Sequence, residues 1–373
     1  MNEDKATRYH RFKRRASVVS LLWGVVFLAA LLASGFSAEM RSAAEATVDR
    51  AGLGLWRAGA ATVVYVALLS VAGEIVGFPL AVYSGFLLER RYGLSNERFS
   101  SWLKDRAKAF GVSLVLAVGG ATLIYGLIRL SPDRWWVAAG AAFALILVGL
   151  TNIGPVLLLP LFYPVKPLDR DVLRARLLAL AERAGARVLG AYEWGLSTKT
   201  KKANAALAGI GGTRRILVSD TMLAEYSDDE IEVVLAHEIG HHVHGDIWKG
   251  IAFESTLIVT GFYLASRLLA ALAPALGLRG VDDVAGLPLL LLAAGAVSLV
   301  MVPVAHAMSR AFERRADRFA LDLTRNPSAF ISAMRRLGAQ NLAEERPSRV
   351  VQWLFYSHPT LHDRISAAQA FKA

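Results

Sequence analysis

Two histidines and a glutamate form the segment of this chain whose residue types and spacing are best suited to catalysis. His237, Glu238 and His241 lie in the run HEIGH at residues 237–241. Residues four apart lie on the same face of a helix, so the two imidazoles can bind one Zn²⁺. The glutamate between them can act as general base on the water that the metal activates. Because only three positions are fixed, roughly one chain in a hundred of this length shows the pattern by chance. The neighbouring segments must therefore show whether the pattern marks a metal site.

A helix start precedes the two histidines. Ser227-Asp228-Asp229-Glu230 is a capping box, with Ser227 as N-cap and Glu230 at the third helical position. Apolar residues then recur at helical spacing: Ile231, Val234 and Leu235. Gly240 and Gly245 are poor helix formers, so we expect the helix to bend or end soon after His244.

A catalytic zinc site needs a third protein ligand and one open position. The pattern with a glycine and a third histidine at fixed offsets beyond the second histidine is excluded, because those positions hold His244 and Ile247. We expect His242 and His244 to be surface histidines.

A glutamate on a separate helix is the better candidate for the third ligand. Glu313 and Asp317 are four residues apart in SRAFERRAD at 309–317, so they share a helix face. Glu313 can bind the metal while Asp317 accepts the ring N–H of a ligand histidine. The alternative is that both carboxylates pair with exposed arginines of the same helix: Arg310, Arg314 and Arg315.

The hydropathy of the chain indicates a membrane protein. Of 373 residues, 54% are hydrophobic, and the mean hydropathy is +0.40. Six apolar runs approach the roughly 20 residues that cross a bilayer: 16–36, 61–84, 109–130, 136–160, 250–272 and 285–308. The last two are interrupted or bordered by Glu254, Arg267 and His306, so their alternative is as buried helices of a soluble domain.

The distribution of charge predicts the topology. The net charge is +11, but the basic residues gather in the N-terminus and the 85–108 loop, whereas the loops at 37–60, 131–135 and 273–284 are balanced or slightly acidic. The positive-inside rule then places both termini and residues 161–248 in the cytoplasm. The basic residues anchor the topology and contact anionic lipid, and no nucleic acid is expected.

Two further points concern processing and redox chemistry. The first span is longer than a usual signal-peptide core, so we expect an uncleaved anchor. The chain has no cysteine, which excludes disulfides, thiolate ligands and a cysteine nucleophile.

The expected organisation has four parts: four spans in 1–160, a cytoplasmic insertion at 161–248, a transmembrane hairpin at 249–308, and the third-ligand helix with a cytoplasmic tail at 309–373. In the insertion we expect an amphipathic helix at 168–184, strands at Val188–Trp194 and Arg215–Ser219, and an edge strand with a Gly-Gly turn within 201–212. Polar groups within the spans should face helix partners or, as we favour, a wet cavity: Glu74, Asn152 and Glu254.

Several segments together resemble the type I CAAX prenyl protease family and its bacterial relatives, which are membrane zinc endopeptidases of the gluzincin kind. They span about residues 60–370: Phe78-Pro79-Leu80 with Tyr83, 89–94, 204–209, Arg215-Ile216, 220–223, HEIGH, SRAFERRAD, Ser357-His358-Pro359 and Arg364-Ile365. The expected fold is therefore mainly α: a polytopic membrane protein with about six transmembrane helices and a small cytoplasmic α+β zinc-protease domain. Eukaryotic members of the family have seven spans around a chamber, and six are counted here.

The resemblance implies a role for each matching residue. One Zn²⁺ per chain would be held by His237, His241 and Glu313, with Glu238 as general base and Asp317 as partner of a ligand histidine. Asn204 would lie on an edge strand that binds the substrate backbone. His358 and Arg364 would orient the substrate or stabilise the oxyanion, or else make structural hydrogen bonds.

The expected activity is hydrolysis of peptide bonds in a bacterial inner membrane, with the active site on the cytoplasmic side. The substrate would be a peptide or protein, lipidated or membrane-embedded. Three functions compete: a protease that trims prenylated peptides, a quality-control protease for membrane proteins, and a non-catalytic membrane scaffold. The general base Glu238 disfavours the scaffold, and the sequence leaves the first two open.

Overall fold

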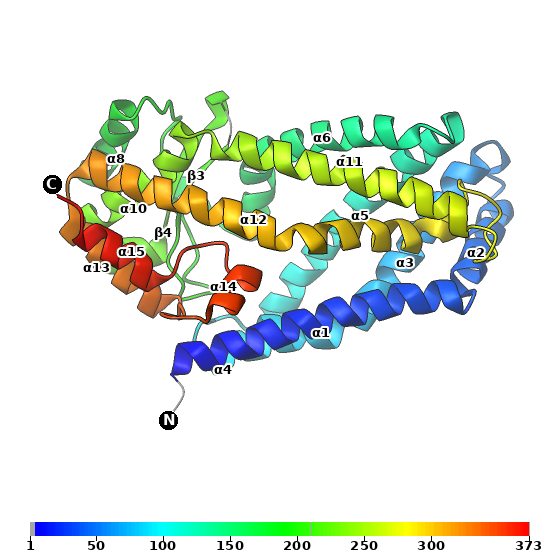
Figure 1. Ribbon diagram of the computed structural model, residues 1–373, viewed down its shortest axis with the longest axis horizontal. Helices are drawn as coiled ribbons and strands as arrows, with labels where there is room; N and C mark the ends of the chain where they lie inside the picture. Colours follow the sequence, from blue (N-terminus) through cyan, green and yellow to red (C-terminus); the bar gives the residue numbers. More distant parts are fainter. Residues whose placement is uncertain (1–3, 210, 373) are drawn as a thin grey trace.

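The protein is elongated, with a bundle of long helices at one end and a small α+β domain at the other (Figure 1). The computed structural model describes residues 4–209 and 211–372. The long helices are α1 (Lys5–Ala33), α3 (Arg57–Ala81), α5 (Phe99–Leu130), α6 (Trp135–Ile153), α11 (Asp246–Leu272) and α12 (Leu287–Thr324). The shorter helices are α2 (Phe36–Arg50), α4 (Leu88–Arg91), α7 (Leu159–Phe162), α8 (Asp171–Arg183), α9 (Asp220–Glu225), α10 (Asp228–Val243), α13 (Pro327–Gln340), α14 (Arg349–Phe355) and α15 (Leu361–Gln369).

Six helical segments of the described chain are long and apolar enough to cross a membrane, which confirms the predicted number. They are Lys5–Ala33, Arg57–Arg91, Phe99–Leu130, Trp135–Phe162, Asp246–Leu272 and Val284–Thr324. The last two qualify despite their charged residues, so they are not helices of a soluble core. In Asp246–Leu272, Glu254 and Arg267 lie eight and five residues from the two ends, where a long side chain can extend toward water.

The α+β domain contains a four-stranded sheet in the order β1-β2-β4-β3. Its strands are β1 (Val165–Pro167), β2 (Ala191–Trp194), β3 (Ala205–Ala208) and β4 (Arg215–Ser219). β2 and β4 are parallel, whereas β1 and β3 pair antiparallel with their neighbours. β3 is therefore an edge strand, as predicted. The strand expected at Val188–Trp194 begins only at Ala191, because Leu189 is exposed and pairing with β4 starts at Ala191.

One apolar core joins the sheet to the helices that carry the site residues. The expected amphipathic helix is α8, whose Leu173, Leu177 and Leu180 are buried in this core. α10 and α12 contribute further buried side chains, including Leu235 and Ala320. α12 runs as one helix, with Pro303 inside it, from the helix bundle into the α+β domain (Figure 1), so it links the expected third-ligand segment directly to the bundle.

The three polar residues in the spans have different surroundings. Glu74 forms a bidentate ion pair with Arg106, with O···N distances of 2.6 and 3.0 Å, and also lines a cavity of about 530 Å³. Asn152 accepts a hydrogen bond from Thr213 at 2.7 Å, so it has a protein partner. Glu254 is exposed, because it lies only two turns after the start of α11.

Candidate metal centre

The helix that carries the two histidines is fixed at both ends. At its start, Ser227 Oγ accepts from the backbone N of Glu230, and the Glu230 carboxylate accepts from the backbone N of Ser227, which confirms the predicted capping box. The other Glu230 oxygen accepts from Ser332 of α13 at 2.5 Å. The helix ends at Val243, and Gly245 follows with φ of +66°, a conformation that favours glycine. The predicted end of the helix is also confirmed.

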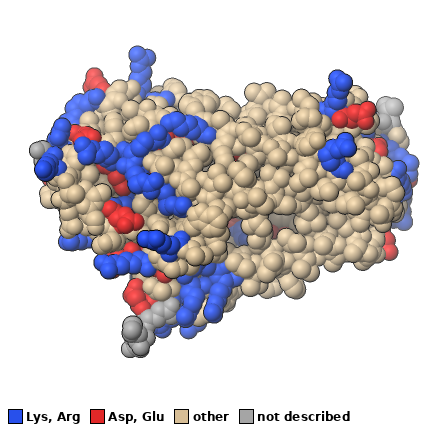
Figure 2. All heavy atoms as spheres, in the orientation of Figure 1, with Lys and Arg blue, Asp and Glu red and all other residues tan. Residues whose placement is uncertain are grey.

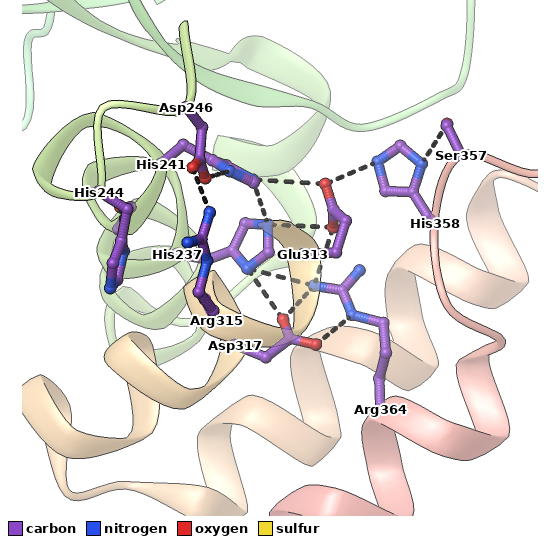
Figure 3. A network of polar contacts seen from close by, with 11 residues as sticks. His237, His241, His244, Asp246, Glu313, Arg315, Asp317, Ser357, His358 and Arg364 are labelled. Atoms are coloured by element: carbon purple, nitrogen blue, oxygen red, sulfur yellow. Dashed lines mark hydrogen bonds and ion pairs between the residues drawn. The ribbon is translucent and has the colours of Figure 1, made fainter. Parts of the chain in front are cut away.

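His237, His241 and Glu313 converge on one point (Figure 3). The two Nε2 atoms are 3.2 Å apart, and each lies 3.3 Å from an oxygen of Glu313. One donor atom from each residue fits within 4.8 Å of the other two. His237 and Glu313 are buried, and His241 is partly buried.

Glu313 reaches the histidines because α10 and α12 approach each other closely at Gly240. A Cβ at Gly240 would lie 3.1 Å from Ala316 Cα and 3.2 Å from the ring of Phe319. Gly240 therefore serves packing within HEIGH, because a side chain there would force Ala316 or Phe319 to shift by a few tenths of an ångström. The alternative for Glu313 and Asp317, an exposed network with arginines of their own helix, is wrong, because both carboxylates are buried against the histidines.

Asp317 lies beside His237, in the position expected of a partner of a ligand histidine. Its Oδ1 is 2.8 Å from Nδ1 of His237, so the ring presents Nε2 to the metal position. Arg364 from α15 donates two hydrogen bonds to the same carboxylate, at 2.5 and 2.9 Å. The predicted residues Asp317 and Arg364 thus both lie at the site, where polar contacts connect His237 to Asp317 and Asp317 to Arg364 (Figure 3).

A second such chain starts at His241 and was not predicted. Nδ1 of His241 lies 3.0 Å from Oδ2 of Asp246, and the other Asp246 oxygen accepts from Arg315 at 2.6 Å. Asp246 is the first residue of α11 and is buried. The signal in the sequence was the pair Gly245-Asp246 five residues after the second histidine, which a left-handed turn brings back under the ring.

Burial and the nearby carboxylates act in opposite directions on the histidines. Burial lowers the pKa of His237, but the neighbouring carboxylates of Asp317 and Glu313 outweigh that effect and raise the pKa to about 9. The pKa of His241 is raised in the same way, against burial, by Glu313 and Asp246. Burial raises the pKa of the Glu238 carboxyl, with the two histidines opposing the shift. In the metal-free protein, the raised pKa values therefore favour protonated rings at His237 and His241.

The donor set fits a divalent cation of intermediate softness. Two imidazole nitrogens and a carboxylate are ligands typical of catalytic zinc sites. One oxygen of Glu313 is buried and accepts no hydrogen bond within the described structure, which suits an acceptor held for a cation. Glu238 lies between the two ligands on the helix and lines the adjoining cleft.

That cleft has a volume of about 400 Å³ and contains the remaining predicted residues. Asn204, immediately before β3, lines it, together with Glu238, His358 and Arg364. Asn204 pairs with Ser219 of β4 through both backbone groups, at 2.9 and 3.0 Å. The other side of β3, an edge strand, is thus left without a strand neighbour among the described residues.

The other histidines have distinct positions. His358 Nε2 lies 3.3 Å from Glu313, its side chain is 60% exposed, and its Nδ1 contacts Ser357 Oγ at 2.9 Å (Figure 3). His244 contacts the Gly240 carbonyl at 2.7 Å and packs against Phe319, away from the metal position. His242 and His244 are both partly buried rather than fully solvated, and neither belongs to the ligand set.

Two family models together match nearly the whole chain. Residues 167–372 match Peptidase family M48, and residues 2–164 match "CAAX prenyl protease N-terminal, five membrane helices". In residues 2–164, the described structure has four candidate spans and the 15-residue helix α2. At 1.5 Å per residue, α2 rises only about 22 Å and is too short to span a bilayer unaided.

Similar proteins come from bacteria and eukaryotes. The uncharacterized metalloprotease YhfN of Bacillus subtilis is 31% identical over 355 residues, which are 94% of this chain and 81% of that protein. CAAX prenyl protease 1 of Saccharomyces cerevisiae is 27% identical over 328 residues, 81% of this chain and 71% of the yeast protein. The crystal structure of S. mikatae Ste24p has the same fold, with a TM-score of 0.84 at 23% identity over 98% of this chain and 87% of that one. The resemblance seen in the sequence is therefore confirmed. The family match also supports a metal-dependent membrane peptidase and argues against a non-catalytic scaffold.

Proposed function

The chain belongs to Peptidase family M48, and from that premise we propose that it is a zinc-dependent endopeptidase with His237, His241 and Glu313 as ligands. The single observation that supports this most strongly is the convergence of both Nε2 atoms on the Glu313 carboxylate at 3.3 Å. Three protein ligands leave one position open for water and substrate, as in catalytic zinc sites. One Zn²⁺ per chain is the cofactor of this proposal.

Glu238 is the general base of the proposed mechanism. When bound, zinc would act as a Lewis acid that makes water nucleophilic at neutral pH and polarises the peptide carbonyl. The Glu238 carboxylate takes the proton from the attacking water and gives it to the leaving amine. Burial, which raises the pKa of this carboxyl, brings its proton affinity closer to that needed for both transfers at neutral pH.

Substrate binding is assigned to the cleft beside β3. An extended peptide adds to the free edge of β3 next to Asn204, where its backbone can form strand-like hydrogen bonds. His358 is exposed in the cleft beside Glu313, so it is the group placed to contact a substrate carbonyl. Arg364 is committed to Asp317 by two hydrogen bonds, so we assign it a positioning role, through Asp317, on His237.

The protein is an integral membrane protein, and we propose a bacterial inner membrane with the metal site on the cytoplasmic side. In support, Lys and Arg side chains crowd around the end that holds the α+β domain (Figure 2), as the positive-inside rule requires of a cytoplasmic face. The substrates are peptides or proteins, and we propose that they are lipidated or membrane-embedded. The bilayer is the second partner, and nucleic acid is not one. We propose the four parts bounded at residues 160, 248 and 308. α11 and the first half of α12 form the hairpin, and α12 continues past residue 308 into the part that carries Glu313.

The test compares purified wild type with Glu238→Gln in detergent, measuring bound metal by mass spectrometry and cleavage of a quenched fluorescent peptide. We expect about one zinc per chain in both proteins and cleavage by the wild type alone. Equal cleavage by both proteins would remove Glu238 from the mechanism. A different bound metal would overturn the zinc assignment, and no metal in either would overturn the ligand set.

A further inference from the structure

Helix α14 presents an apolar face that the described residues leave largely exposed. Val350, Trp353 and Leu354 lie at i, i+3 and i+4, so they share one side of the helix, and they are 66%, 53% and 36% exposed. None of the seven described residues of α14 is buried. A helix this short is marginal in water by itself, so its apolar side needs a partner outside the chain.

The position of α14 in the fold is set by two arginines from two different spans. It lies between α1 and α12, where the helix bundle meets the α+β domain (Figure 1). Arg310 of α12 donates to the carbonyls of Gln352 and Tyr356 at 3.2 and 2.7 Å. Arg14 of α1 donates to the Tyr356 hydroxyl at 3.0 Å and to Glu344 at 2.5 Å.

Both arginines stand at the edge of the membrane-facing surface of their helices. Val18 begins the exposed apolar surface of α1 four residues after Arg14, and on α12 Val304 is exposed six residues before Arg310. At 1.5 Å per residue these separations are about 6 and 9 Å. Arginine side chains extend to the headgroup level at the ends of spans. The two helices therefore place α14 independently at the same membrane boundary.

The composition of α14 agrees with this location. Arg346 and Arg349 are exposed at its start, where they can contact lipid phosphates. Trp353 lies on the apolar face, and tryptophan is enriched at the headgroup level of membranes. A short helix with basic residues beside an apolar face that contains tryptophan is suited to lie in the plane of the interface.

We propose that α14 is an interfacial helix whose face of Val350, Trp353 and Leu354 inserts into the lipid bilayer surface on the metal-site side. The chain continues from α14 into Tyr356 and His358, which line the active-site cleft. The bilayer surface thus anchors the segment that carries His358, and the mouth of the cleft lies beside the lipid. The inference rests on the membrane spans and not on the catalytic proposal.

Because the chain has no cysteine, single-cysteine variants can report the depth of α14 directly. The protein is reconstituted into nanodiscs of phosphatidylethanolamine and phosphatidylglycerol after nitroxide labelling of Val350→Cys or Trp353→Cys. The matched control is Val172→Cys on α8, a valine that is 74% exposed on a helix far from the bundle. Collision of the label with oxygen, which partitions into lipid, and with a water-soluble nickel chelate is measured by electron paramagnetic resonance.

At positions 350 and 353 we expect frequent collision with oxygen and a nickel collision rate several-fold below that at position 172. Nickel collision equal to that at position 172 would overturn the proposal, because α14 would then lie in water. Shielding from both reagents would also overturn it, because a protein surface would then cover the helix. A size-exclusion profile and an unfolding temperature equal to those of the wild type check that each variant is folded, so no step of the test depends on metal binding or proteolysis.

Discussion

Asp246 lies 3.0 Å from Nδ1 of His241, so the turn between α10 and α11 adjoins the proposed metal centre. Gly245 makes the turn with φ of +66° and delivers the carboxylate to the underside of the ring. The arrangement repeats that of Asp317 on His237, with Arg315 and Arg364 as the respective outer partners. Each of the two proposed ligand histidines thus has its own carboxylate, and each carboxylate has its own arginine. This arrangement would orient both rings with Nε2 toward the proposed metal position.

The substitution Asp246→Asn should weaken zinc binding about 10- to 100-fold, because the neutral amide no longer orients the His241 ring or strengthens it as a donor. Zinc affinity would be measured by competition with a chelator of known affinity. The matched control is Asp322→Asn, which removes an exposed carboxylate paired with Arg318 on α12. If both variants bind zinc as the wild type does, Asp246 has no part in holding the ligand.

The substitution Gly240→Ala should destabilise the protein and reduce its metal content. Alanine is favoured over glycine in a helix by about 1 kcal/mol, but the added methyl would stand 3.1 Å from the backbone of Ala316. Overpacking of this kind costs about 1–3 kcal/mol, and relief requires α12 to move away with Glu313. The net change in the free energy of unfolding should therefore be a loss of up to about 2 kcal/mol.

Gly250→Ala is the control for that substitution. Gly250 lies within α11 with open space around its Cβ position, so helix propensity alone acts and the variant should be as stable as wild type or more so. Thermal unfolding in detergent and zinc per chain would be measured for both variants. A Gly240→Ala protein with full zinc content and unchanged unfolding temperature would show that α10 and α12 can separate without cost.

The features that depend on helical spacing within a few residues could be predicted from the sequence. The capping box, the helix face that joins His237 to His241, and the pair Glu313 and Asp317 all follow from helical spacing within a few residues. The contact of α1 with the end of α14 was not predictable in this way, because Arg14 and Tyr356 are 342 residues apart. Asp246 could not be predicted for another reason. The left-handed turn at Gly245 ends α10, so the helical spacing from His241 does not extend to Asp246.

Metal binding at neutral pH should release at least one proton. In the metal-free protein the pKa of His237 is raised to about 9, so the ring is charged at pH 7.5, whereas a ligand imidazole must be neutral at the ligating nitrogen. Titration calorimetry in buffers of different ionisation enthalpy counts the protons released. The count should fall as the pH rises through 9, and zinc affinity should weaken by about tenfold per pH unit below it. A count of zero at pH 7.5 would contradict a protonated His237.

The same shift affects the stability of the metal-free protein in a defined direction. The pKa of His237 is 6.5 in its ordinary state and higher in the folded protein, so its charged pairing with Asp317 and Glu313 stabilises the fold fully below pH 6.5. That contribution is lost as the pH rises from 6.5 through about 9. Unfolding temperatures of chelator-treated protein should therefore decline over this range, and His237→Gln should abolish that part of the decline.

Asn341→Ala should raise KM while leaving kcat nearly unchanged. The Asn341 amide accepts from the backbone N of Ala203 at 3.1 Å and donates to its carbonyl at 3.2 Å, so it holds the chain just before the proposed substrate-binding edge. Each lost hydrogen bond is worth about 1 kcal/mol, which corresponds to a rise in KM of about five- to thirty-fold. The catalytic groups on α10 and α12 do not contact Asn341 in the described structure, so the chemical step should be retained. The control is Asn96→Ala, which removes a surface hydrogen bond to the Ser197 carbonyl outside the cleft. A loss of kcat at constant KM in Asn341→Ala would contradict a role in substrate binding.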